Sequence, residues 1–252
     1  MRSTKQQDLT TACAGWPRAA LELGLGLAGV ALIGGGLSAA VGLPVAVLLG
    51  AVAVQGALCA LLWRHWPDPG RSLGPANHVT LGRAALVALL AGAVLVPSWA
   101  QQHAWLLAGM AGAALLLDGV DGWVARRWRC ESAFGARFDM EVDAFLMLVL
   151  CVHLLSMGNA GPWVLAIGLM RYGFVLAMLR WPWLDAPLPA SRRRKLVCVW
   201  QVASLLLCML PVVGPPLAAW LLGLALGLLA GSFAIDVRWL YRSAASARVA
   251  RP

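Results

Sequence analysis

The length of its apolar runs constrains this chain more than any other feature. Between Ala19 and Trp63 the only charged side chain is Glu22. A run of this length holds two membrane-spanning helices, because each needs about 20 predominantly apolar residues to cross the hydrocarbon core. Only 12% of the residues are charged, whereas ordinary soluble domains carry about 25%. The sequence therefore predicts an all-α integral membrane protein rather than a water-soluble domain.

Among the connections between the apolar runs, only alternate ones contain clusters of basic residues. These clusters include Arg126–Arg129 and Arg192–Lys195, whereas the connections Gly34–Pro44 and Pro211–Pro216 contain no lysine or arginine. This alternation is the positive-inside pattern, which places the basic connections and both termini in the cytoplasm. The net charge of +9 then reflects topology and attraction to anionic lipid or substrate. We therefore do not expect a nucleic-acid partner.

Hydropathy and the basic clusters predict eight spans in two groups. The first two, Leu21–Leu37 and Leu43–Trp63, form a hairpin, which we favour over a signal peptide because Val41–Pro44 makes a plausible turn between them. The other six form a core: Asn77–Pro97, Trp105–Trp128, Ala136–Met157, Trp163–Leu179, Leu196–Leu210 and Leu217–Leu240. The predicted units are residues 1–66 with the hairpin, a linker over 67–76 rich in proline and glycine, the six-helix core over 77–241, and a basic tail over 242–252.

Four of the eight aspartates fall within one stretch of 26 residues. Asp118 and Asp121 are spaced i, i+3 and therefore share one face of a helix. Asp139 and Asp143 are spaced i, i+4 on the next helix, whereas Glu141 falls on the opposite side and is excluded. Two helical faces are thus expected to present two carboxylates each.

Four carboxylates at a membrane boundary need a counter-charge. Like charges repel one another, and an acidic group in a bilayer costs several kcal/mol. Divalent cations resolve both problems, and hard oxygen ligands suit Mg²⁺ or Mn²⁺. Two such ions stabilise the attacking and leaving oxygens in phosphoryl chemistry. The small residues Gly122, Ala125 and Gly135 leave room for a ligand, and Arg126 can contact a phosphate. The competing interpretation is that the aspartates only pair with neighbouring arginines.

The stretch from Asp118 to Asp143 resembles the signature of the CDP-alcohol phosphotransferases, D-x2-D-G-x2-A-R-x8-G-x3-D-x3-D, at every fixed position. A second element, Asn77-x-x-Thr80-x-x-Arg83, resembles the N-x-x-T-x-x-R opening of that family. Taken alone, Asn77 could cap a helix and Arg83 could be a snorkelling side chain.

The resemblance implies a six-helix core that transfers a phosphatidyl group from a CDP-linked donor, usually CDP-diacylglycerol, to an alcohol with release of CMP. It implies that Asp118, Asp121 and Asp139 bind two metal ions and that Asp143, also close to the metals, is the general base. It assigns the nucleotide pocket to Asn77, Thr80, Arg83, Gly122, Ala125, Arg126 and Gly135. It further implies a homodimer, and we expect a bacterial inner-membrane protein whose active site faces the cytoplasm.

The acceptor alcohol is less constrained. Arg171 lies within a predicted span and Lys195 at the start of the next, where cations would suit glycerol 3-phosphate or inositol phosphate; serine and choline are alternatives. Arg171 could instead pair with a motif aspartate, and Lys195 could serve topology alone. Two readings from other classes are a cation transporter, which clustering of the acids at one boundary disfavours, and a catalytically silent homologue.

Overall fold

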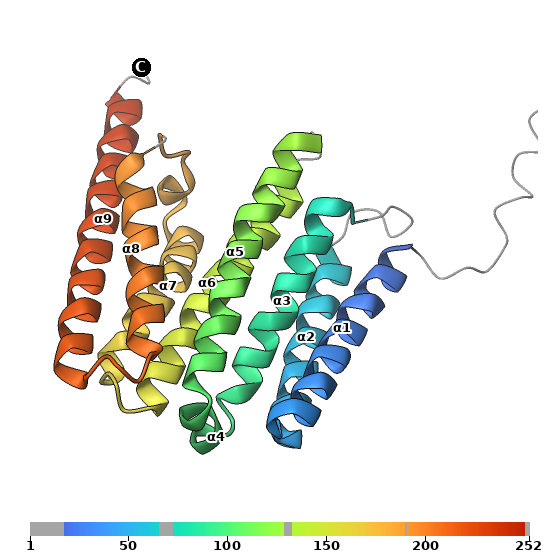
Figure 1. Cartoon of the computed structure of the whole chain (residues 1–252). Helices are drawn as coiled ribbons and strands as arrows, with labels where there is room; N and C mark the ends of the chain where they lie inside the picture. Colours follow the sequence, from blue (N-terminus) through green and yellow to red (C-terminus); the bar gives the residue numbers. More distant parts are fainter. Residues whose placement is uncertain (1–17, 66–72, 129–132, 190, 250–252) are drawn as a thin grey trace, which may run out of the picture.

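The computed structural model describes residues 18–65, 73–128, 133–189 and 191–249, which form helices and no strands. Long helices occupy all eight predicted spans (Figure 1): α1 Arg18–Val41, α2 Val45–His65, α3 Pro75–Ala93, α5 Ala104–Trp128, α6 Ala133–Ser156, α7 Leu165–Arg180, α8 Arg192–Met209 and α9 Pro215–Val249. Two short 3-10 turns, Pro162–Val164 and Pro182–Asp185, flank α7.

The short helix α4, Pro97–Gln102, was not predicted. The sequence places the end of a span at Pro97, but α3 ends four residues earlier, at Ala93. Proline supplies no backbone N–H and fits the first position of a helix, so Pro97 begins a new helix instead of ending the old one. The turn between α1 and α2 follows the expected pattern, because Gly42 has a φ of 65° and its N–H donates to the Ser38 carbonyl.

Helix α3 lies between the N-terminal hairpin and the rest of the bundle. It packs on α1 and α2 on one side and on α5 and α6 on the other. The contact with α2 is very close, since a Cβ atom added to Gly92 would lie 2.2 Å from the Val47 carbonyl oxygen. Small residues allow helices in a bilayer to approach closely enough for such packing. The hairpin is therefore firmly docked on α3.

Within the described residues, four helices are long and apolar enough to cross a membrane: Arg18–Val41, Val45–His65, Pro162–Arg180 and Pro215–Ala244. A shorter apolar stretch covers Ala104–Val120. The other long helices run beside these and carry more polar residues: the aspartate motif on α5 and α6, a basic cluster on α8, and Asn77, Thr80 and Arg83 on α3. The chain is thus an all-α membrane protein, and the count of eight spans stays a prediction.

The helices alternate in direction, so their ends fall into two sets (Figure 1). The upper set contains the ends of α2, α5, α7 and α9 and the starts of α3, α6 and α8. The basic segments predicted to face the cytoplasm adjoin this set. The aspartate motif, on the end of α5 and the start of α6, is at the same end of the bundle.

Candidate active site

Three of the four motif aspartates form a compact group, as the spacing predicts. Asp118 on α5 and Asp139 and Asp143 on α6 each offer a carboxylate oxygen, and these oxygens lie within 4.8 Å of one another. Their side chains are 36–38% exposed, so the group is neither sealed from solvent nor fully open to it. Asp121 also lies on α5, but its side chain is outside the described part of the chain.

Arg83 of α3 is the cation that meets these carboxylates. Its Nη1 atom donates to Oδ1 of Asp118, and its Nη2 atom donates to Oδ1 of Asp139 and, at 3.2 Å, to the Asp139 carbonyl oxygen. The Nη1 atom also lies 3.4 Å from Oδ1 of Asp143. The Arg83 side chain is only 1% exposed. We call Arg83, Asp118, Asp139 and Asp143 the acidic cluster.

The acidic cluster has the chemistry of a divalent-cation site. Among the described side chains, with all groups ionised, one guanidinium offsets only one of three carboxylate charges, because arginine carries a single fixed positive charge. Oxygen donors from carboxylates suit Mg²⁺ or Mn²⁺. The residues therefore fit the metal dependence expected from the sequence. The competing interpretation is not settled, because the side chains of Arg126 and Arg129 beside the motif lie outside the described residues; the arginine described on these aspartates, Arg83, belongs to another helix.

The other polar residues of the Asn77 element are buried in α3. The Asn77 side chain donates through Nδ2 to the Leu73 carbonyl oxygen at 2.7 Å. Asn77 and Thr80 are 8% and 3% exposed. Helix α3 begins at Pro75 with Gly74 as its N-cap, so the alternative that Asn77 caps the helix is wrong. Nor is Arg83 a snorkelling side chain, since it is fully buried on the carboxylates.

Fewer contacts are described for the remaining residues expected in the nucleotide pocket. Gly122, Ala125 and Arg126 belong to α5, but their side chains lie outside the described residues. Gly135 is partly buried in the first turn of α6, one turn before Asp139. Their assignment to the nucleotide stays a prediction.

Arg171 has a partner that the sequence did not suggest. Its Nη2 atom donates to Oε1 of Glu141 at 2.6 Å. Glu141 therefore faces α7, away from Asp139 and Asp143, as its helical position predicts. The expected alternative, in which Arg171 pairs with a motif aspartate, is wrong because Arg171 pairs with Glu141 instead.

Asp236 on α9 is a second residue that the sequence analysis missed. Arg193 donates to its Oδ1 atom and, at 2.7 Å, to the Ser232 carbonyl oxygen, while Arg194 lies 3.6 Å from its Oδ2 atom. We call Arg193, Arg194 and Asp236 the α8–α9 cluster. An acid inside a predicted span, beside a basic cluster on the preceding span, was the available signal. Lys195 of the same basic segment is exposed.

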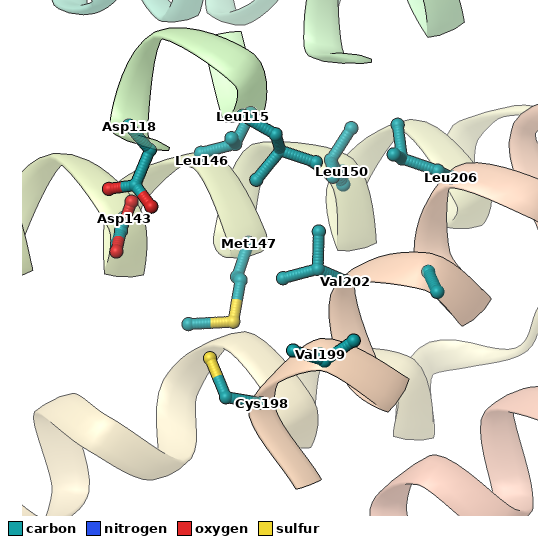
Figure 2. A pocket seen from close by; sticks show the side chains of 11 residues that line it. Leu115, Asp118, Asp143, Leu146, Met147, Leu150, Cys198, Val199, Val202 and Leu206 are labelled. Carbon is teal, nitrogen blue, oxygen red and sulfur yellow. The ribbon is translucent and has the colours of Figure 1, made fainter. Parts of the chain in front are cut away.

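A cavity of about 340 Å³ adjoins the acidic cluster (Figure 2). Asp118 and Asp143 lie at one end of it. The rest of its wall is apolar and comes from α5, α6 and α8, through Leu115, Leu146, Met147, Leu150, Cys198, Val199, Val202, Ala203 and Leu206. A ligand with a charged group and an apolar part would match this division.

Comparisons with known proteins agree with the motif. The family model described as CDP-alcohol phosphatidyltransferase matches residues 74–231. The chain is 35% identical over 95 residues to CDP-diacylglycerol–glycerol-3-phosphate 3-phosphatidyltransferase 1, chloroplastic/mitochondrial, of Arabidopsis thaliana, which covers 35% of this chain and 31% of the relative. It is 29% identical over 110 residues to the cardiolipin synthase (CMP-forming) of Oryza sativa subsp. japonica, which covers 40% of this chain and 32% of the relative.

The chain thus spans about a third of the length of these curated relatives. No solved structure matches it. The family match is more extensive: it covers over half of the 252 residues, from the residue before α3 into α9. It contains every residue of the acidic cluster. The chain therefore belongs to the CDP-alcohol phosphatidyltransferase family.

Proposed function

We propose that this protein transfers a phosphatidyl group from CDP-diacylglycerol to an alcohol, with release of CMP, in phospholipid biosynthesis. The observation that carries the proposal is the position of the acidic cluster at the end of an apolar-walled cavity. A lipid-linked nucleotide has the same division into a charged headgroup and apolar chains. The names of the two relatives, a phosphatidyltransferase and a CMP-forming synthase, support both the transferred group and the release of CMP.

The carboxylates are the proposed metal ligands. Asp118, Asp139 and Asp143, together with Asp121 from the same motif, would hold two Mg²⁺ or Mn²⁺ ions. When bound, such ions neutralise phosphate charge and stabilise the attacking and leaving oxygens. Arg83 bonds to Asp118 and Asp139 and so fixes the orientation of both carboxylates. With Asn77 and Thr80 on the same helix, it would also face the nucleotide.

Asp143 is the proposed general base. It lines the cavity beside Asp118, and Arg83 is farther from it than from Asp118 or Asp139. A carboxylate in this position can accept the proton of an acceptor hydroxyl as that oxygen attacks phosphorus. The oxygen forms the new phosphoester bond, and the bond to the CMP oxygen breaks.

Glycerol 3-phosphate is the proposed acceptor, because it is the alcohol in the name of the Arabidopsis relative. Lys195 is exposed one turn before Cys198, a residue of the cavity wall, and could reach an acceptor phosphate there. Arg171 is 30% exposed while paired with Glu141, so it can offer its remaining donors to a ligand. We further propose a homodimer in a bacterial inner membrane, with the motif end of the bundle facing the cytoplasm.

The experiment is a CMP-release assay with purified protein, CDP-diacylglycerol and Mg²⁺ or Mn²⁺. Glycerol 3-phosphate is compared with inositol phosphate, serine, choline and a phospholipid with a free hydroxyl. Asp143→Asn should lower kcat by about 100- to 10,000-fold, the usual range for losing a general base. Glu141→Gln is the matched control, since it removes a carboxylate two residues away that faces α7.

Wild-type rates in Asp143→Asn would contradict the assigned role, and no CMP from any acceptor would contradict the reaction. The alternative of a cation transporter is tested in liposomes. It requires metal-dependent uptake without nucleotide, which we do not expect.

A further inference from the structure

Glu22 is the one charged residue in the long apolar stretch of the N-terminal hairpin, and it bonds to the start of α3. Its Oε2 atom accepts a hydrogen bond from the Leu73 backbone N–H at 2.7 Å. The same oxygen lies 3.2 Å from Nε2 of His78 in the first turns of α3. Its side chain is only 17% exposed. Glu22 lies near the start of α1, at the motif end of the bundle, and an acidic side chain buried to this extent needs polar partners.

The segment held by Glu22 is also held by Asn77, the first residue of the Asn77 element. Leu73 donates its N–H to Glu22 and accepts the Asn77 side-chain amide on its carbonyl oxygen. Glu22, Leu73 and Asn77 thus form a continuous chain of hydrogen bonds from α1 into α3. Gly74, the N-cap of α3, offers no side chain to cap the helix, so the negative Glu22 beside its first turn is placed favourably for the helix dipole.

Apolar contacts are expected to dock the hairpin on α3 without help from Glu22. Helix α2 packs closely on α3 through the Gly92 contact, and α1 packs on both of these helices through buried apolar residues such as Leu23 and Val30. The apolar interface therefore holds the hairpin in place. The described bonds of Glu22 act locally: they fix Leu73, just before α3, and His78, in its first turns.

We infer that Glu22 is a positioning residue for the Asn77 element. Through Glu22, the N-terminal hairpin helps to orient residues of the active site. It holds Leu73 and His78, Leu73 orients the Asn77 amide, and Asn77 lies two helical turns from Arg83 of the acidic cluster. This inference rests on the proposed function, in which Asn77 contacts the CDP part of the donor.

The test compares donor and acceptor kinetics in full-length protein. Glu22→Ala should raise the KM for CDP-diacylglycerol about tenfold, the effect of losing one charge-assisted hydrogen bond. The kcat and the KM for the acceptor should stay within about twofold, because the change acts on donor binding alone. His78→Ala should raise the donor KM by about threefold, since it removes only a partly exposed partner.

Ser38→Ala is the matched control, because Ser38 lies at the opposite end of α1 and bonds only within the hairpin turn. It should leave both KM values unchanged. Glu22→Gln keeps an oxygen acceptor for the Leu73 N–H, so its KM for CDP-diacylglycerol should stay close to the wild-type value.

An unchanged donor KM in Glu22→Ala would overturn the inference. So would a uniform loss of kcat, donor affinity and acceptor affinity, because that pattern means general destabilisation. Failure of wild-type protein to release CMP would instead contradict the proposed function, so the two failures are distinguishable.

Discussion

The acidic cluster and the α8–α9 cluster are built from the same two residue types in different proportions. Among the described residues, one arginine meets three aspartates in the first, and two arginines meet one aspartate in the second. The first adjoins a cavity and has half-exposed carboxylates. In the second, the carboxylate is 14% exposed and ties α8 to α9. The balance of charge therefore separates a site that attracts cations from an ion pair that joins two helices.

Arg83→Met gives the largest expected effect. The change leaves three neighbouring carboxylates without their buried arginine, and breaking a fully buried ion pair costs about 3–5 kcal/mol. Because these carboxylates are 36–38% exposed, the free energy of unfolding should fall by less than that in metal-free protein, and CMP release should be lost. Added Mg²⁺ should restore part of the stability, since it supplies the missing positive charge. Denaturant unfolding in detergent, with and without Mg²⁺, measures both changes, and equal stability to wild type would contradict the assigned pairing.

Metal addition to wild-type protein is the next largest effect. A ligand that binds only the folded state stabilises it by about 2.7 kcal/mol at 100 times its Kd. The Tm should therefore rise with Mg²⁺ or Mn²⁺. Asp118→Asn removes one ligand and should lose most of this rise, whereas Asp236→Asn should keep it. A metal-dependent rise that is the same in both variants would show that the cation binds elsewhere.

Glu141→Gln should have the smallest effect. It breaks the ion pair with Arg171, in which the two side chains are 50% and 30% exposed. Exposed pairs contribute about 0–1 kcal/mol, so the unfolding free energy should change by less than about 1 kcal/mol. The variant should also keep the metal-dependent rise in Tm. If that rise is lost, Glu141 belongs to the metal site and the helical separation of the carboxylates is wrong.

The parts of this structure that sequence predicted are those set by local periodicity. Apolar runs located the long helices, and the i, i+4 spacing placed Asp139 and Asp143 on one face of α6 while turning Glu141 away. These inferences need only the helical repeat. The start of α4 was missed because Pro97 is compatible with either the end or the start of a helix.

Partners across helices were not predictable in the same way. Arg83 is 35 residues from Asp118 and 56 from Asp139, and Arg193 is 43 residues from Asp236. Their pairing depends on how each helix is rotated and shifted against its neighbours. That rotation follows from close packing, such as the Gly92 contact between α2 and α3, which periodicity does not reveal.

The most direct test of the central claim is CMP release by Asp139→Asn and Asp236→Asn side by side. Each change neutralises one aspartate that is paired with arginine. Asp139→Asn should lower activity more than about 100-fold, because even an outer partner of a metal site contributes about 10- to 100-fold. Asp236→Asn should stay within about threefold of wild type once its folded fraction is matched, since it loses only hydrogen bonds worth about 1–3 kcal/mol of stability. Comparable activity in the two variants would contradict the account.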